Sequence, residues 1–165
     1  MKIGITADLH LKSKDETPER YNALDKIASY LHRKNINQLI IAGDLFDKEQ
    51  YNYNDFDVFC KQHQNIIFYT IAGNHDAGIE QRYFSADNIK IITKPEILNF
   101  NSLNFLFVPY DFKKSMDETI DGFISNSNNF NDLNGFVIVG HGDYISTVKI
   151  ENIYETGVYM PLSSN

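Results

Sequence analysis

The sequence predicts a layered α/β domain. Short apolar runs rich in β-branched residues alternate with segments whose apolar residues recur at helical spacing, a pattern typical of a parallel sheet covered by helices. The length of 165 residues and the hydrophobic content of 42% suffice for the core of about one domain. Several apolar runs end in polar side chains, which places candidate ligands at the ends of strands.

The composition excludes several classes of protein. No charged-then-apolar signal segment opens the sequence, and no apolar run approaches the roughly 20 residues needed to cross a bilayer, so we expect a soluble, cytoplasmic protein without membrane association. Cys60 is the only cysteine, which excludes a disulfide framework and a cysteine-based metal site. The net charge of −7 argues against nucleic-acid binding by phosphate neutralisation alone, although carboxylates gathered around metal ions would form a positive site.

The first half of the chain predicts three strands and two helices. Strands are expected over 2–7, 38–42 and 66–71, where β-branched residues cluster. Thr17 and Pro18 are typical of a helix start, with threonine as N-cap and proline at the first helical position. A short second helix is expected around Phe56, Val58, Phe59 and Cys60. The residues expected on the core-facing stripe of the first helix are Tyr21, Leu24, Ile27, Ala28 and Leu31.

The second half predicts shorter elements. Strands are expected over 89–92, 97–100, 104–108 and 136–139, and the turn-like Asn101-Ser102 would join the second and third of them as a hairpin. An Asn/Ser-rich loop is expected over 125–134. A further amphipathic helix is indicated by Met116, Ile120, Phe123 and Ile124.

Four of the predicted strands end at residues that can bind a metal ion. The carboxyl ends of parallel strands deliver ligand-binding residues to one edge of a sheet, where the sheet holds their loops in place. Oxygen and nitrogen donors without thiolates suit manganese, iron or zinc. In an extended chain the spacing of Asp8 and His10 would put both side chains on the same side. The four segments are Asp8-Leu9-His10, Gly43-Asp44, Gly73-Asn74-His75-Asp76 and Gly140-His141.

Each segment alone also has a simpler structural explanation. Asp44 and Asp47 could cap a helix or form turns. Asn74 could be a turn residue, and His141 could be a hydrogen-bonded histidine at a strand end. It is the combination of the four strand ends that favours a metal site.

Together and in this order, these segments resemble the first four motifs of the calcineurin-like metallophosphoesterase family. Asp-Leu-His-Leu at 8–11, Gly-Asp-Leu-Phe-Asp at 43–47 and Val-Pro-Tyr at 108–110 are most similar to the nuclease subunit of SbcCD-type DNA repair exonucleases and their phage relatives. The resemblance runs over nearly the whole chain. It implies that residues 1–165 form a nuclease domain, folded as a layered α/β sandwich with mixed β-sheets flanked by helices.

The resemblance implies a centre with two divalent metal ions. Asp8 and His10 would bind one ion, Asn74 and His141 the second, and Asp44 would bridge the two. The ions, Mn²⁺ in the first place with Fe²⁺ or Zn²⁺ as alternatives, would clamp phosphate oxygens and activate a water for in-line attack on phosphorus.

The resemblance also implies catalytic residues beside the ions. His75 would not be a ligand but would face the substrate, where an imidazolium stabilises negative charge or protonates the leaving oxygen. Asp76 is a second catalytic candidate that could orient the His75 ring, and a plain turn or capping role is equally open. Asp47 is a candidate for supporting the ligands from behind.

One departure from the family concerns its fifth motif, Gly-His-x-His, which would complete both metals and has no match here. The segment 155–165 resembles the stretch that precedes this motif, so we expect a C-terminally incomplete domain with one imidazole missing from each metal, and a site that is empty or partly occupied. His32 and His63 are expected on solvated helix surfaces. The five histidines of the chain are at positions 10, 32, 63, 75 and 141.

Two other functions stay open on the same scaffold. One is a small-molecule phosphomonoesterase or cyclic-nucleotide phosphodiesterase, because the same metal centre serves all of them. The other is a non-catalytic assembly or binding module, against which the retention of His75 argues. The resemblance implies DNA as substrate, a coiled-coil ATPase subunit of the SbcC type as partner, and a homodimer. Tyr51, Tyr53, Phe56 and Phe59 are candidates for such an interface, although core packing explains them better.

Overall fold

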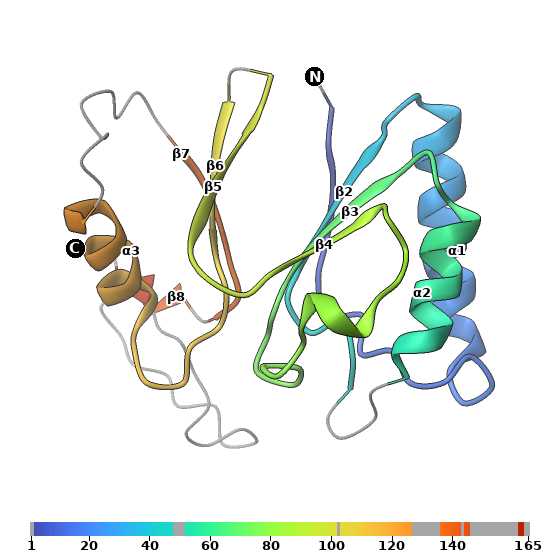
Figure 1. Cartoon of the computed structure of the whole chain (residues 1–165), viewed down its shortest axis with the longest axis horizontal. Coiled ribbons are helices and arrows are strands. Elements are labelled where there is room, and N and C mark those ends of the chain that lie inside the picture. The colour runs from blue at the N-terminus through green and yellow to red at the C-terminus, as the bar shows by residue number, and fades with distance from the viewer. Residues whose placement is uncertain are drawn as a thin grey trace.

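The computed structural model describes six stretches of the chain, which are residues 2–47, 52–101, 103–126, 136–142, 144–145 and 162–163. Strands and helices alternate through the first half, and strands dominate the second (Figure 1). In chain order the elements are β1 (Gly4–Thr6), α1 (Pro18–Arg33), β2 (Gln38–Ala42), α2 (Tyr53–Gln62), β3 (Ile67–Ile71), the 3₁₀ turn η1 (Gln81–Tyr83), β4 (Ile89–Ile92), β5 (Glu96–Phe100), β6 (Leu103–Val108), α3 (Met116–Asn126), β7 (Phe136–Gly140), β8 (Tyr144–Ile145) and β9 (Leu162–Ser163).

The first sheet is fully parallel, with the strand order β1-β2-β3-β4. Its register pairs Ile5 with Ile40 and Ile40 with Tyr69. Both α1 and α2 lie on its outer face, as expected when each helix connects two neighbouring parallel strands (Figure 1). The carboxyl ends of all four strands therefore meet at one edge of the sheet.

The second sheet is mixed, with the order β5-β6-β7. The strands β5 and β6 form the expected antiparallel hairpin, and Asn101 in its turn has a positive φ of 47°. The strands β6 and β7 are parallel, so β7 ends at the same edge as β6. Helix α3 lies on the outer face of this sheet, so the two sheets face each other between helical layers (Figure 1).

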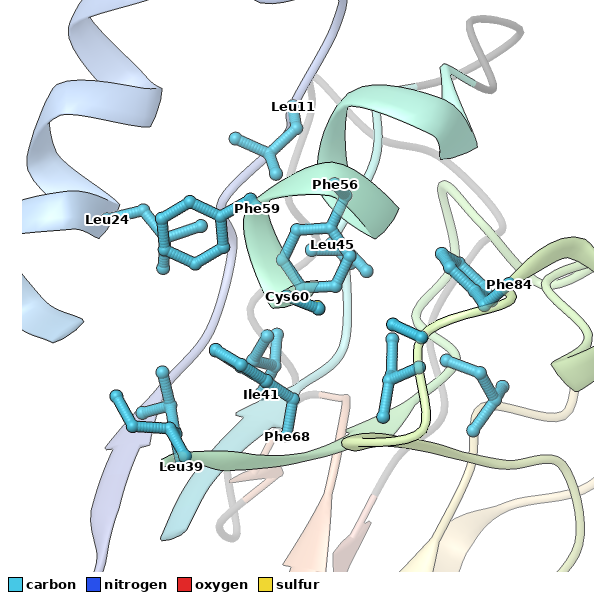
Figure 2. Close-up of a cluster of buried hydrophobic side chains, with 14 of the residues drawn as sticks. Leu11, Leu24, Leu39, Ile41, Leu45, Phe56, Phe59, Cys60, Phe68 and Phe84 are labelled. Atoms are coloured by element: carbon cyan, nitrogen blue, oxygen red, sulfur yellow. The ribbon is translucent and has the colours of Figure 1, made fainter. Parts of the chain in front are cut away.

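Apolar side chains fill the spaces between the layers. Between α1, α2 and the first sheet lies an aromatic-rich cluster that includes Phe56 and Phe68 (Figure 2). Between the two sheets, Ile40 and Ile71 pack with Phe107. A small third cluster contains Met116 beneath α3. The predicted α/β sandwich with mixed sheets flanked by helices is confirmed.

Most predicted elements are confirmed within a residue or two of their bounds, and one bound is wrong. The helix α1 has Thr17 at its N-cap position and begins at Pro18, as predicted. The Thr17 hydroxyl makes no capping hydrogen bond, and its Oγ1 accepts one from the backbone N–H of Lys12 at 3.3 Å. Of the loop expected over 125–134, residues 125 and 126 belong to α3 instead, and residues 127–135 lie outside the described part of the chain.

The aromatic residues proposed for an interface belong largely to the core. Phe56 and Phe59 are buried, and Tyr53 packs against the same cluster. Tyr51 lies outside the described residues, as does segment 155–165 apart from β9.

None of the described helices combines the length and the hydropathy that a membrane span requires.

Candidate metal centre

The five predicted ligands come together at the carboxyl edge of the sheets. Asp8 and His10 follow β1, and Asp44 follows β2. Asn74 follows β3, and His141 follows β7 of the second sheet. The central carboxylate belongs to Asp44, whose side chain is only 4% exposed.

The distances around Asp44 define the centre. Its Oδ2 lies 3.7 Å from Nε2 of His10 and 3.4 Å from Nε2 of His141. The Nε2 of His10 is also 4.0 Å from Oδ1 of Asp8. On the opposite side, Nε2 of His141 is 2.9 Å from Oδ1 of Asn74. Asp44 therefore lies between the two predicted ligand pairs, where a bridging ligand would have to be.

The backbone of this edge is in an unusual conformation. Asp8, His10 and Asp44 have φ angles of 56°, 44° and 50°, in the left-handed region that non-glycine residues rarely adopt. The expectation of an extended chain from Asp8 to His10 is therefore wrong, although the two side chains do meet. Such conformations cost on the order of 1–3 kcal/mol each and concentrate at functional sites.

Backbone hydrogen bonds hold the first two loops in this conformation. The N–H of Asp8 donates to the carbonyl of Gly43 at 3.2 Å, and the N–H of His10 donates to the carbonyl of Asp44 at 2.9 Å. Leu11 continues the pattern with a bond to Leu45 at 2.8 Å. The two loops are thus joined directly beyond the ends of β1 and β2.

Two glycines allow the ligands to approach. Gly43 has a φ of 89°, and a Cβ atom at this position would overlap the ring of His141. A Cβ atom on Gly73 would overlap the carboxylate of Asp44. The Gly-Asp and Gly-Asn motifs are therefore steric requirements of the centre, because any larger residue would displace a predicted ligand.

The electrostatics of the centre favour a cation. Burial by itself would lower the pKa of His141, but the Asp44 carboxylate and the Ala42 carbonyl raise this pKa to about 9. Nδ1 of His141 donates to that carbonyl at 2.9 Å, which leaves Nε2 directed at Asp44 and Asn74. Burial would likewise raise the pKa of Asp44, but its hydrogen bonds with His141 and the His75 N–H hold this pKa below its ordinary value.

His75 lies beside the centre. Its ring packs edge-on against the ring of His10, with the centroids 4.6 Å apart, and its backbone N–H donates to Oδ1 of Asp44 at 3.0 Å. Its Nδ1 is buried and makes no well-aligned hydrogen bond, yet it lies 3.4 Å from Oδ1 of Asp47. The other oxygen of Asp47 is 3.4 Å from Nζ of Lys12.

Asp76 is fully buried and faces backbone rather than the His75 ring. Its oxygens accept hydrogen bonds from the N–H of Gly73 at 2.7 Å and from the N–H of Phe46 at 3.1 Å. Burial raises the pKa of this carboxyl group. These contacts match the turn role left open by the sequence, and the carboxylate beside the ring belongs to Asp47. A catalytic role for Asp76 stays a prediction.

Sequence reasoning missed two basic residues at this edge. Lys12 forms the ion pair with Asp47, and Arg20 from α1 donates hydrogen bonds to the carbonyls of Leu9 and His10. No motif signals either residue, since lysine and arginine near a helix start are common on solvated surfaces.

His63, expected on a solvated helix surface, lies away from the centre, with its Nε2 3.2 Å from Oδ1 of Asp25.

The donor set fits divalent ions. In the described part of the chain, two groups of side chains could each hold an ion with ligand atoms within 4.8 Å of one another. The close approach of Gly43 and Gly73 to the side chains of His141 and Asp44 is a further sign of a site built for a ligand. The groups are Asp8 with Asp44 and His141, and His10 with Asp47 and His75.

One family of known proteins matches nearly the whole chain. The sequence profile described as calcineurin-like phosphoesterase matches residues 1–163. The chain belongs to this family. The resemblance indicated by the four motifs is thus confirmed, and members of the calcineurin-like phosphoesterase family depend on a pair of metal ions.

Two individual proteins are similar to this member of the family. The DNA double-strand break repair protein Mre11 of Nanoarchaeum equitans is 36% identical over 84 residues, which cover 45% of this chain and 23% of that protein. The chain therefore matches about a quarter of that relative's length. The crystal structure of the Pseudomonas putida nuclease MPE aligns with a TM-score of 0.44 and 23% identity, over 63% of this chain and 52% of that one.

Proposed function

We propose that this chain is a two-metal phosphodiester hydrolase that acts on DNA. The observation that carries the proposal is the convergence of Asp8, His10, Asn74 and His141 around the buried carboxylate of Asp44. Membership in the calcineurin-like phosphoesterase family supports metal-dependent hydrolysis of phosphate esters.

In the proposed centre each ion has three ligands from the described residues. Asp8 and His10 would hold the first ion, Asn74 and His141 would hold the second, and Asp44 would be shared between them. Two divalent ions, Mn²⁺ in the first place, would supply charge stabilisation for the phosphate and lower the pKa of a nucleophilic water. The amide oxygen of Asn74 contributes a donor without adding charge.

The remaining chemistry belongs to His75. In the proposal its imidazolium faces the substrate and gives a proton to the leaving oxygen. Its ring is confined by the edge contact with His10, and its buried Nδ1 faces Asp47. This leaves Nε2 as the nitrogen that would carry the transferred proton.

The proposed substrate is supported by one relative of this chain. The matched protein from Nanoarchaeum equitans is described as a DNA double-strand break repair protein. Following the resemblance of the motifs to SbcCD-type nucleases, we extend the proposal to a cytoplasmic nuclease that works as a homodimer with a coiled-coil ATPase subunit of the SbcC type. Phe56 and Phe59 are unsuited as anchors of such interfaces, because both are buried in the core.

The substrate assignment can be tested by comparing hydrolysis rates. Purified protein with Mn²⁺ should degrade linear duplex and single-stranded DNA faster than it hydrolyses p-nitrophenyl phosphate or a cyclic nucleotide. A preference for either small ester would replace the nuclease by a phosphomonoesterase or a cyclic-nucleotide phosphodiesterase. Failure to hydrolyse any of them would favour a binding or assembly module.

A further inference from the structure

The first turn of α1 reaches back over the loop that carries the first two ligands. The hydroxyl of Tyr21 donates to the carbonyl of Lys12 at 3.4 Å, and Oγ1 of Thr17 accepts from the N–H of the same residue at 3.3 Å. Arg20 reaches further toward the centre, and its Nη1 donates to the carbonyl of Leu9 at 3.2 Å and to the carbonyl of His10.

These two carbonyls belong to the most unusual stretch of backbone in the centre. Asp8 and His10 both have positive φ angles, a conformation that persists only when surrounding contacts stabilise it. The N–H groups of the loop are bound by the carbonyls of Gly43, Asp44 and Leu45, as described above. Arg20 is the side chain that satisfies the opposite, carbonyl side of the same loop.

A guanidinium group suits this position for a geometric reason. It is planar and presents its N–H donors in a fixed arrangement, and here the Nη1 group reaches two successive carbonyls. A lysine ammonium is a compact point charge on a flexible stem, so it would fix the loop less well. Nε of Arg20 also lies 4.0 Å from Oε1 of the exposed Glu19, a pair that contributes little.

We propose that Arg20 is a positioning residue for the first metal site, which fixes the left-handed loop so that the imidazole of His10 is presented to Asp8 and Asp44. This inference rests on the metal ligands of the proposed function. It does not depend on the substrate. Residues that orient metal ligands from behind typically contribute 10- to 100-fold to metal affinity.

The test measures Mn²⁺ binding by isothermal titration calorimetry on the full 165-residue chain. Arg20→Met, which keeps the apolar stem, should weaken binding at one of the two sites by about 10- to 100-fold and leave the other unchanged. Arg20→Lys should give an intermediate loss.

Two matched controls separate positioning from general stability. Tyr21→Phe removes a hydrogen bond from the same turn to Lys12, beyond the ligands, and Arg33→Met removes an exposed arginine from the last turn of the same helix. Both should bind Mn²⁺ like the unmodified chain. Circular dichroism and thermal melting without metal should show that all four variants fold.

A spectroscopic and a chemical readout address the positioning itself. Electron paramagnetic resonance of the Mn²⁺-loaded chain should show a coupled pair of ions, and Arg20→Met should show an isolated ion at the same total Mn²⁺. Added methylguanidine should restore part of the lost affinity of Arg20→Met and have no effect on Tyr21→Phe. These effects are not expected if Arg20 only fastens α1 to the sheet.

The outcomes distinguish this inference from the proposed function. If Arg20→Met binds both ions as tightly as the unmodified chain, or loses both equally together with its thermal stability, the positioning role is wrong. It is also wrong if the unmodified chain binds no ion. If the unmodified chain binds two ions and Arg20→Met loses one, but DNA is not hydrolysed, the positioning role stands and the proposed function fails.

Discussion

The two sheets contribute unequally to the candidate centre. Among the described residues, the parallel sheet supplies Asp8, His10, Asp44 and Asn74 from three successive strand ends, whereas the mixed sheet supplies His141. In the proposed centre the first metal site would therefore be assembled within one sheet, and the second would span the interface between two. The second proposed site would depend on how the sheets pack, and the first on the local conformation of one pair of loops.

The largest effect is expected from the residue that both sites share. Asp44→Asn keeps the shape of the side chain but removes the charge that would bridge the ions, so several kcal/mol of charge stabilisation should be lost. We expect Mn²⁺-dependent hydrolysis to fall at least about 1,000-fold, measured as the rate at saturating Mn²⁺. Unchanged hydrolysis would remove Asp44 from the centre.

Replacing His10 or His141 by alanine tests the difference between the two proposed sites most directly. If the proposed centre is correct, opening of the mixed sheet away from the parallel sheet would remove His141 from the second ion and weaken its binding, but would leave the ligands of the first ion in place. Saturating Mn²⁺ at 100 times its dissociation constant should therefore slow amide exchange in β6 and β7 by about 100-fold, equivalent to about 2.7 kcal/mol.

His141→Ala should abolish this protection of β6 and β7, and His10→Ala should keep it. Hydrogen exchange measured with and without Mn²⁺ on both variants checks the expectation. Equal protection in the two variants would show that neither site is specific to the interface between the sheets.

Gly43 and Gly73 allow a steric test of the same difference between the two sheets. Gly43→Ala would drive a methyl group into His141 across the sheet interface, and Gly73→Ala would drive one into Asp44 within the parallel sheet. Each should lower the free energy of unfolding by about 1–3 kcal/mol and weaken Mn²⁺ binding. Gly78→Ala, where an added Cβ meets no atom within 4 Å, is the matched control and should change neither. Denaturant unfolding and calorimetry provide the two measurements.

The smallest effect is expected at a buried carboxylate outside the centre. Asp57 accepts hydrogen bonds from Ser85, Ala86 and Lys61, all at 2.7–2.8 Å. Burial acts to raise the pKa of Asp57, but these partners lower it from 3.8 to about 2. A lowered pKa contributes stability that is complete above pH 4 and is lost as the pH falls through 2.

Asp57→Asn should therefore reduce the free energy of unfolding at pH 7 by about 1–2 kcal/mol, a value that allows for the partly exposed Lys61. The difference from the unmodified chain should shrink as the pH falls toward 2. Asp87→Asn, at an exposed position next to Ser85 and Ala86, is the control. A difference that does not depend on pH would show that Asp57 acts through packing alone.

The sequence predicted which side chains gather at the candidate centre better than the way in which they are held there. Runs of β-branched residues located β2 and β4 to the residue, and the rule that ligands follow strand ends led to Asp44, Asn74 and His141. These features are local, so a single stretch of sequence carries them.

The remaining features depend on contacts between distant segments. The left-handed backbone at Asp8 and His10 is stabilised by the loop after β2 and by Arg20, neither of which a local pattern reveals. The contacts of Asp76 with Gly73 and Phe46 likewise join two loops that are separate in the sequence. Spacing arguments that assume an extended chain fail at such positions, because tertiary contacts override the local preference.

The central claim is that two ions lie on either side of Asp44. Anomalous X-ray diffraction from crystals soaked in Mn²⁺ tests it most directly. We predict two anomalous peaks about 3.5–4 Å apart, one bounded by Asp8 and His10 and the other by Asn74 and His141. A single peak among His10, Asp47 and His75, or no peak near Asp44, would contradict it.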